Sequence, residues 1–227
     1  MIQALVFDLD GLIIDTEGPE FRAWQELYQE NGGELSFDIF ARMIGTRSDF
    51  DLVGHLVEHS GHQLDRTACL ERVRMRCDEL LRHQTLLPGV EDYLHEGKQM
   101  GLKLGVASSS SRAWVTRHLT RLRIDEYFDC IRCWGDGERA KPEPDLYRAV
   151  LEDFQVKPEE AVAFEDSPNG ILAAKRAGLR CVAVPNPLTA KLDLSLADLS
   201  LQSLSDIGLA ELLVELMERD SQRPEAR

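Results

Sequence analysis

Positive charge is scarce in this chain. Its 227 residues include 26 lysines and arginines against 40 aspartates and glutamates, and the net charge at neutral pH is −14. Nucleic acids and anionic membrane surfaces attract basic proteins, so neither is expected as a partner. An anionic substrate would have to be drawn to this acidic protein by cations placed locally.

Long apolar stretches are also missing. The sequence has no run of about eighteen apolar residues that could cross a membrane. Its first residues do not show the charged segment, apolar stretch and small-residue cleavage site of a secretory signal. We therefore expect a cytoplasmic protein. We also expect a monomer, whose length allows either one sizeable domain or one domain with a smaller insert.

Cysteine is sparse, and the metal-binding patterns that it could form are incomplete. The five cysteines are an odd number scattered along the chain, which fits reduced thiols better than a disulfide framework. Cys130 and Cys133 form a lone C-x-x-C, for which ordinary strand cysteines are favoured over a metal or redox role. His55, His59 and His62 fall near one helix face, but no H-E-x-x-H glutamate accompanies them, so a solvated face is favoured.

The first sixteen residues hold the clearest pattern. The apolar run Ala4–Phe7 is followed at once by Asp8, Asp10 and a glycine, which predicts a buried strand whose end carries two acidic side chains. Carboxylates two residues apart on extended backbone point to the same side, and a cation would offset their repulsion. The same residues could instead only cap the next helix. An EF-hand loop is excluded, because Leu12 stands where calcium needs an oxygen ligand.

Residues 17–85 show helical periodicity and no confident strand. Phe21, Trp24 and Leu27 recur at three-residue steps, and three further helices are expected with N-caps at Ser36, Ser48 and Asp65. We predict an all-helical cap at residues 17–85, inserted into a core formed by residues 1–16 and 86–220. Residues 221–227 are polar and are expected to form a flexible tail.

From residue 86 onward, strands alternate with helices. Apolar runs near residues 103–107, 130, 161–164 and 181–184 are each followed or preceded by a helical segment. This alternation predicts an α/β fold, a Rossmann-like doubly wound parallel sheet with right-handed crossovers. Ligands of such sheets bind outside the carboxyl ends of the strands.

Four places in the core put polar groups at such strand ends. They are Asp8 with Asp10, the serines from Ser108 onward, Lys141 before a proline, and Glu165 with Asp166. Each group alone could be a helix cap or a surface residue, but their joint occurrence is typical of one shared site. Four carboxylates and one lysine leave three negative charges, which would repel a phosphate unless a Mg²⁺ ion were bound. With that ion, an aspartate can act as a nucleophile on phosphorus.

These motifs resemble the haloacid dehalogenase superfamily over nearly the whole chain. The matching stretches are Phe7-Asp8-Leu9-Asp10-Gly11 with Asp15-Thr16, then Ser108, Lys141-Pro142 and Phe164-Glu165-Asp166-Ser167. Within the superfamily the chain is similar to the β-phosphoglucomutase-like branch, whose helical cap follows the first motif. The resemblance implies a Mg²⁺-dependent phosphatase that acts on a small phosphorylated metabolite, plausibly a sugar phosphate, through an aspartyl-phosphate.

The resemblance also implies a role for each motif residue. Asp8 would be the nucleophile, and Asp10 the general acid and then the general base. Ser108, Ser109 and Lys141 would hold the phosphoryl oxygens. Asp8, the backbone carbonyl of Asp10 and Asp166 would bind Mg²⁺, with Glu165 in or next to that shell. The dehalogenases lack an aspartate at the position of Asp10, so a phosphoryl substrate is favoured over a carbon–halogen bond.

Two cap residues bear on the choice of substrate. Sugar-phosphate mutases of this branch carry a histidine where this chain has Glu20, so a phosphatase is favoured over a mutase, which remains the alternative. Arg47 could contact a phosphate or sugar from the cap, or be a solvated arginine. A non-catalytic binding or regulatory protein is disfavoured, because both Asp8 and Asp10 are present.

Overall fold

The structure is a computed structural model that describes residues 1–136 and 139–221. Its centre is a six-stranded parallel sheet with the strand order β3-β2-β1-β4-β5-β6. The strands are β1 (Ala4–Phe7), β2 (Lys103–Ser111), β3 (Cys130–Trp134), β4 (Ala161–Glu165), β5 (Arg180–Ala183) and β6 (Leu199–Ser200). The prediction of a Rossmann-like α/β fold is confirmed.

Nine α-helices lie in the described part of the chain, joined in places by short 3₁₀ helices. They are α1 (Glu17–Glu30), α2 (Phe37–Phe40), α3 (Leu52–Ser60), α4 (Arg66–Leu81), α5 (Val90–Gln99), α6 (Arg112–Leu122), α7 (Asp145–Phe154), α8 (Pro168–Ala177) and α9 (Leu209–Ser221). None of the helices described combines the length and the apolar character needed to cross a membrane. The predicted tail lies outside the described residues, apart from Ser221 at the end of α9.

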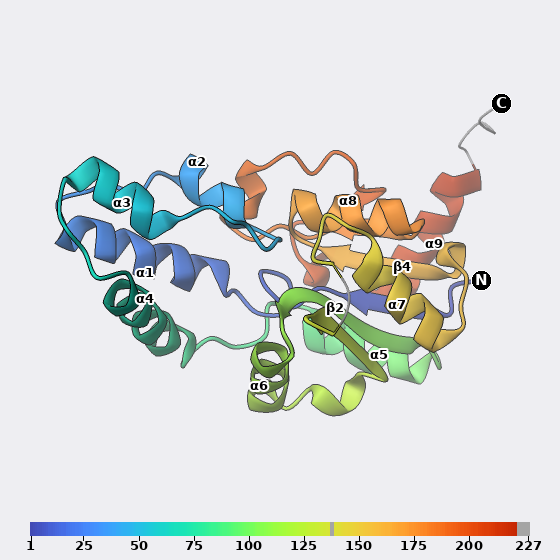
Figure 1. Cartoon of the computed structure of the whole chain (residues 1–227). Helices are drawn as coiled ribbons and strands as arrows, with labels where there is room; N and C mark the ends of the chain where they lie inside the picture. The colour runs from blue at the N-terminus through green and yellow to red at the C-terminus, as the bar shows by residue number, and fades with distance from the viewer. Residues whose placement is uncertain (137–138, 222–227) are drawn as a thin grey trace.

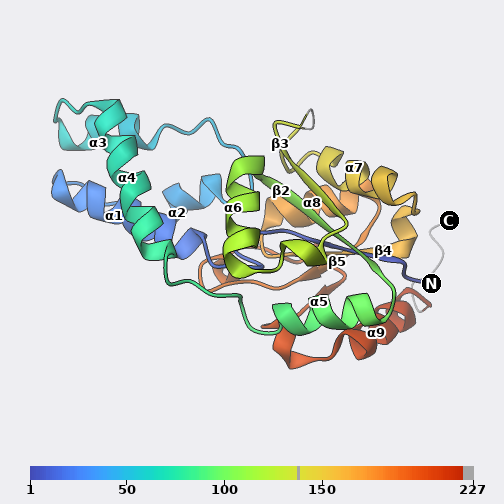
Figure 2. The same ribbon diagram turned by 90° about the horizontal axis from the view of Figure 1, so that it is seen from below.

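Side chains alternate along β1 between two hydrophobic layers. Leu5 and Phe7 belong to the cluster that includes α5, α6 and α9. Ala4 and Val6 belong to the cluster on the opposite face, which includes α7 and α8. Figure 2 shows α5 and α9 on one side of the sheet and α7 on the other. Because both faces are covered, every residue of β1 is buried, as in other parallel sheets.

The pairing register decides which residues meet at the edge of the sheet. Phe7 of β1 lies level with Val106 of β2 and with Phe164 of β4. The residues one step beyond, Asp8 and Glu165, are therefore neighbours where the strands end. The backbone N–H of Asp8 donates to the carbonyl of Phe164 at 3.1 Å, which fixes this level.

Helices α1–α4 lie beyond this edge of the sheet, on the left of Figure 1. They share a hydrophobic cluster of their own, with Trp24, Tyr28, Leu56 and Val73 among its buried members. Among the described residues, 17–85 contain helices and no strand. That residues 17–85 form a cap domain, separate from a core of residues 1–16 and 86–220, stays a prediction.

Two local expectations were wrong. Helix α3 begins at Leu52, after Asp51, so Ser48 does not cap it. Strand β6 was missed, because two paired residues are too few to produce an alternating pattern. The expected cap at Asp65 is present, since its carboxylate accepts hydrogen bonds from the N–H groups of Thr67 at 2.8 Å and Ala68 at 3.1 Å.

Candidate active site

A buried lysine lies between two carboxylates at the carboxyl end of the sheet. The Nζ atom of Lys141 is 2.8 Å from Oδ1 of Asp8 and 2.6 Å from Oε1 of Glu165. Lys141 is only 1% exposed. The phenolic hydroxyl of Tyr147, on α7, donates to the same Glu165 oxygen at 2.6 Å. Two strand ends, the loop before α7 and helix α7 itself therefore contribute to a single dehydrated ion cluster.

Burial shapes the charges of this cluster. It raises the pKa of Asp8 to about 7, although Lys141 opposes the rise. Burial would lower the pKa of Lys141, but the carboxylates of Asp8 and Glu165 raise it overall. Lys141 is therefore cationic at neutral pH. Its charge is the local cation that an acidic protein needs in order to hold an anion.

Three carboxylates come close enough together to share a cation. One oxygen each from Asp8, Glu165 and Asp166 lie within 4.8 Å of one another, and all three residues are buried. The Oδ1 atom of Asp166 has no hydrogen-bond partner among the described residues. Burial raises the pKa of Asp166 well above its usual value. A donor set made only of carboxylate oxygens suits a hard cation such as Mg²⁺.

Asp10 lies beside this cluster, with both carboxylate oxygens engaged. Thr16 Oγ1 donates to Oδ1 at 2.8 Å, and the indole N–H of Trp114 donates to the same atom at 2.9 Å. Ser110 Oγ donates to Oδ2 at 2.7 Å, and Ser108 Oγ reaches that oxygen at 3.4 Å. The side chain of Asp10 is therefore held from the loop after β1, from the end of β2 and from α6.

The turn that follows Asp10 requires glycine. Gly11 has a φ of +79°, and a Cβ there would lie 2.2 Å from Oδ2 of Asp166. Any side chain at this position would displace a carboxylate of the cluster.

The two serines expected to hold phosphate are placed differently. Ser108 is fully buried, and its Oγ accepts the N–H of Ser110 at 3.0 Å. Ser109 lines the cavity described below, and its Oγ accepts the N–H of Lys141 at 3.2 Å. Ser109 is the better placed of the two to reach a ligand.

A loop of the helical region is docked onto the strand ends. Asn169 Nδ2 donates to the carbonyl of Ile44 at 2.9 Å, and the hydroxyl of Thr46 donates to the carbonyl of Lys141. Gly45 has a φ of +70°, and a Cβ there would lie 2.1 Å from Oγ of Ser167. The loop therefore approaches the catalytic edge as closely as bare backbone allows.

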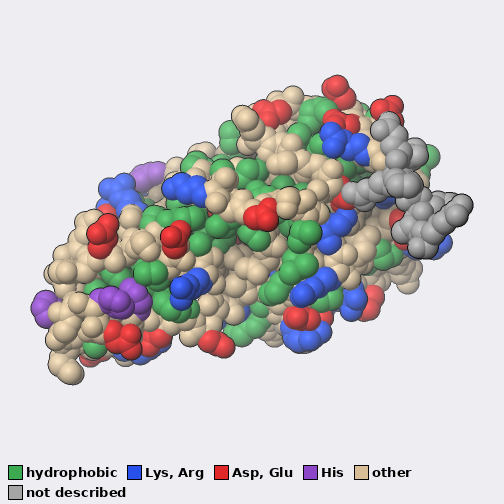
Figure 3. Space-filling model, turned by 90° about the horizontal axis from the view of Figure 1, so that it is seen from above, with side chains coloured by type: hydrophobic (Ala, Val, Ile, Leu, Met, Phe, Trp, Pro, Cys, Tyr) green, Lys and Arg blue, Asp and Glu red, His purple; other side chains and the backbone are tan. Residues whose placement is uncertain are grey.

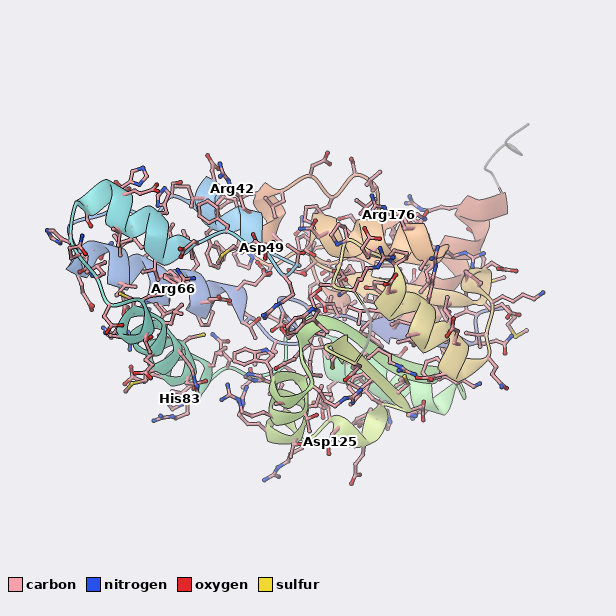
Figure 4. All side chains as sticks on the ribbon, viewed as in Figure 1. Arg42, Asp49, Arg66, His83, Asp125 and Arg176 are labelled. Carbon is pink, nitrogen blue, oxygen red and sulfur yellow. The ribbon has the colours of Figure 1, made fainter. Side chains whose placement is uncertain are left out.

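A cavity of about 650 Å³ separates this edge from helices α1 and α4. Asp8, Asp10 and Trp114 line one side of it, while Glu20 and Arg47 line the other. Two further arginines, Arg66 and Arg74, also face it. Figure 4 places Arg66 between α1 and α4, where its guanidinium pairs with Asp51 at 2.5 Å.

Glu20 and Arg47, the two predicted cap residues, are less constrained than the core residues. Glu20 is exposed to the cavity. The guanidinium of Arg47 stacks over the ring of Trp134, 4.2 Å from its centroid, and so joins the cap loop to β3.

The His55–His59 pair and the C-x-x-C cysteines, which the sequence offered as metal or redox candidates, lie apart from this site. His55 and His59 stack with their ring centroids 4.0 Å apart, and Figure 3 shows histidine side chains at the far end of the helical region. Cys130 Sγ donates to a carboxylate oxygen of Asp153 at 2.7 Å, and Cys133 is fully buried.

Three residues that the motifs did not single out also contact the site: Trp114, Tyr147 and Asn186. Asn186, in the loop after β5, donates from Nδ2 to Oδ2 of Asp166 at 3.0 Å. Tyr147 ends the run Lys141-Pro142-Glu143-Pro144-Asp145-Leu146-Tyr147, which begins at a motif residue, and this closeness was a usable signal. Trp114 and Asn186 had no such signal, because they are separated from their partners by 104 and 20 residues.

Comparisons with known proteins agree with this geometry. A family model described as haloacid dehalogenase-like hydrolase matches residues 5–184. A Bacillus subtilis (strain 168) protein provisionally named phosphatase YhcW is 41% identical over 95% of this chain and 98% of its own. Hexitol phosphatase B of Escherichia coli (strain K12) is 32% identical, covering 93% and 97% of the two chains. The crystal structure of β-phosphoglucomutase from Clostridium difficile aligns with a TM-score of 0.76 at 25% identity, covering 98% of this chain and 100% of that one.

Proposed function

The chain belongs to the haloacid dehalogenase-like hydrolases, in their β-phosphoglucomutase-like branch, and from this premise we propose that it is a Mg²⁺-dependent phosphatase. Its substrate is a small phosphorylated metabolite, plausibly a sugar phosphate. The observation that carries the proposal is the buried cluster in which Lys141 bridges Asp8 and Glu165 beside the unpartnered oxygen of Asp166.

The cluster fits a magnesium ion. Asp8 and Asp166 would hold it with carboxylate oxygens, the backbone carbonyl of Asp10 would add a ligand, and Glu165 would lie in or next to that shell. When bound, Mg²⁺ neutralises carboxylate charge and polarises the phosphoryl oxygens of the substrate. Lys141 would bind a phosphoryl oxygen while it keeps Asp8 in place, and Ser109 and Ser108 would support the same group.

In the first step, a carboxylate oxygen of Asp8 bonds to phosphorus as the bond from phosphorus to the leaving oxygen breaks. Asp10 gives its proton to that leaving oxygen, so the product departs as an alcohol. In the second step, Asp10 takes a proton from water as the water oxygen bonds to phosphorus. The bond to Asp8 then breaks and releases inorganic phosphate, and both aspartates return to their starting states.

Glu20 separates this proposal from a mutase. Desolvation raises the pKa of Glu20 to about 7, but a carboxyl group, protonated or not, cannot supply the positive charge that the histidine of the related mutases can carry. Release of inorganic phosphate from glucose 1-phosphate without added bisphosphate would favour the phosphatase. Conversion to glucose 6-phosphate that depends on bisphosphate would favour the mutase.

Metal removal tests the proposal directly. Activity on a panel of phosphorylated metabolites, measured as released phosphate, should disappear in excess chelator and return when Mg²⁺ is added. Full turnover in the presence of the chelator would show that the carboxylate cluster works without a metal ion, and would overturn the mechanism.

A further inference from the structure

We propose that Asn186 is a positioning residue for Asp166. Its amide holds one carboxylate oxygen of Asp166 inward, so that the other oxygen faces the metal ion. The inference rests on the proposed function, because it takes Asp166 to be a metal ligand. It concerns a residue outside every motif of the sequence.

The amide of Asn186 has a defined orientation. Its Oδ1 accepts hydrogen bonds from the backbone N–H groups of Leu188 at 2.8 Å and Thr189 at 3.0 Å. Its own backbone N–H donates to Oγ1 of Thr189 at 2.9 Å. Since two N–H donors face one end of the amide, that end must be the oxygen, and the other end is the NH₂ group. The residue is 5% exposed, so water does not compete for these contacts.

The NH₂ group is shared between two carboxylates. Nδ2 lies 3.0 Å from Oδ2 of Asp166 and 2.9 Å from Oε2 of Glu17, with the carbonyl of Gly11 at 3.4 Å. The amide has two hydrogens, so each carboxylate can receive one. Asn186 therefore holds one oxygen of Asp166 while it also holds Glu17, the first residue of α1.

The two oxygens of Asp166 are left in different states. Oδ2 accepts a hydrogen bond from Asn186, whereas Oδ1 is buried and accepts none from a donor group in the described part of the chain. The carboxyl of Glu17 also lies within hydrogen-bond reach of Asp166. A buried carboxylate oxygen without a partner is costly, unless a cation or donor is meant to occupy the space before it. Asp166 contributes an oxygen to the group that Asp8 and Glu165 complete.

Backbone packing leaves no substitute for the amide. A Cβ on Gly11 would lie 2.2 Å from Oδ2 of Asp166 and 2.7 Å from Nδ2 of Asn186. The turn after β1 therefore packs directly against the hydrogen bond between Asn186 and Asp166. Without the NH₂ group, Oδ2 loses its donor, and the carboxylate of Asp166 can rotate out of the group of oxygens that it forms with Asp8 and Glu165.

The test compares the full-length wild-type chain with Asn186→Leu and Asn186→Ala in their affinity for Mn²⁺, which serves as a paramagnetic probe of a Mg²⁺ site. Binding is measured by electron paramagnetic resonance without substrate. Removal of such outer contacts typically weakens metal binding about 10- to 100-fold, and that loss is expected in both variants. At saturating Mg²⁺, kcat should recover to within about threefold of wild type, since no reacting group has been removed.

Asn169→Leu is the matched control, because Asn169 lies three residues from Asp166 but donates to the carbonyl of Ile44 instead. It should leave the affinity for Mn²⁺ unchanged. A merely structural role for Asn186 would lower the melting temperature of the metal-free chain without weakening Mn²⁺ binding, and that result would overturn the inference. If Asn186→Leu does not fold, the smaller Ala variant decides.

The outcome for the wild-type chain separates the two proposals. A wild-type chain that binds no Mn²⁺ and turns over in chelator contradicts the proposed function, and the role of Asn186 with it. A wild-type chain that binds Mn²⁺, beside Asn186 variants that bind it equally well, contradicts only the positioning role.

Discussion

The two walls of the active-site cavity are built in opposite ways. The core wall is made of charged groups that are buried and bonded to one another: Lys141 is 1% exposed and contacts both Asp8 and Glu165. On the opposite wall, the cap wall formed by the helical region, the side chains are not joined into one cluster: Arg66 pairs with Asp51, Arg47 stacks on Trp134, and Arg74 is exposed to solvent. A wall of interlocked charges can hold one geometry for one reaction. A wall whose side chains are held separately from one another can change from one enzyme to another without disturbing that chemistry.

Removing Asp8, the proposed nucleophile, should have the largest effect. Asp8→Asn keeps the shape of the side chain but removes the oxygen that would attack phosphorus and a ligand of the metal. Turnover should fall by on the order of 10⁴- to 10⁶-fold, the scale seen when an enzyme loses its nucleophile. Intact mass after a rapid acid quench checks this. The wild-type chain should carry a phosphate adduct, and an adduct that persists in Asp8→Asn would identify a different nucleophile.

Breaking the ion cluster should damage stability as well as activity. Lys141→Met leaves Asp8 and Glu165 facing each other in a dehydrated site, which should cost about 3–5 kcal/mol of unfolding free energy. Lys98→Met is the matched control, since Lys98 pairs with Asp129 at the surface, where ion pairs contribute little. Urea unfolding of both variants measures the difference. Equal losses of unfolding free energy would mean that the charges of the core wall depend on one another no more than those of a surface ion pair do.

Replacing Asp10, the proposed general acid and base, should affect the two steps of the reaction differently. Asp10→Asn should slow hydrolysis of an alkyl phosphate by roughly 10²–10⁴-fold. An aryl phosphate needs less help to expel its leaving group, so its first step should slow less than the attack by water. Phosphoryl-enzyme should then accumulate on Asp8, and the same acid-quench mass measurement detects it.

Trp114→Phe should slow hydrolysis of alkyl phosphates more than that of aryl phosphates, as Asp10→Asn does, but by a smaller factor. The indole N–H donates to Oδ1 of Asp10 at 2.9 Å, and Phe removes this donor while keeping an aromatic ring. A hydrogen bond to a charged group stabilises by about 1.5–3 kcal/mol, so a loss of roughly 10-fold or more on alkyl phosphates is expected, with less on aryl phosphates. Trp134→Phe keeps a ring beneath Arg47 and serves as the control. Equal losses on the two substrate types would contradict a role through Asp10.

Sequence could predict the core wall because sheet geometry carries the information. Asp8, Lys141 and Glu165 each follow or adjoin a strand, and parallel strands bring such ends to one edge. The bond from Trp114 to Asp10 spans 104 residues, and that from Asn186 to Glu17 spans 169. Neither hydrogen bond leaves a pattern in the local sequence, because a single hydrogen bond between distant segments depends on how the helices and loops pack. The short strand β6 was missed for a different reason, because two paired residues produce no alternating pattern, and Asp51 instead of Ser48 precedes the first turn of α3.

Glu17 lies where the two walls meet. The pH dependence of its effect on stability should show whether it behaves like the buried charges of the core wall or like an exposed side chain of the cap wall. Burial raises the pKa of Glu17 to about 8, from an ordinary value of 4.5. The folded chain thus binds this proton more tightly than the unfolded chain. Its stabilising contribution is complete below about pH 4.5 and is lost as the pH rises through 8.

Glu17→Gln mimics the protonated form at every pH. In excess chelator, the variant should therefore gain stability relative to wild type between pH 5 and pH 8, by on the order of 2 kcal/mol. Urea unfolding at the two pH values measures this gain. Glu26→Gln, on the same helix, is the control: the hydrogen bond from Arg76 lowers the pKa of Glu26, so its effect should not grow across that range. No change with pH for Glu17→Gln would place Glu17 with the exposed cap wall.

The smallest effects are expected on the cap wall itself, and Arg47 with Arg42 offers a matched pair. Both arginines lie in the helical region and stack on an aromatic ring, Arg47 on Trp134 and Arg42 on Phe50 at 5.3 Å. Only Arg47 lines the cavity. Figure 4 shows Arg42 on the outer side of this region.

Arg47→Ala should therefore change the ranking of phosphorylated metabolites by kcat/KM about 2- to 10-fold, the effect of one hydrogen bond. It should slow a small aryl phosphate by less than about twofold, because that substrate reaches only the core wall. Arg42→Ala should change neither quantity. If Arg47→Ala slowed the aryl phosphate as much as Trp114→Phe does, the cap wall would take part in the chemistry. The view that the core wall carries out the reaction while the cap wall sets substrate selectivity would then be wrong.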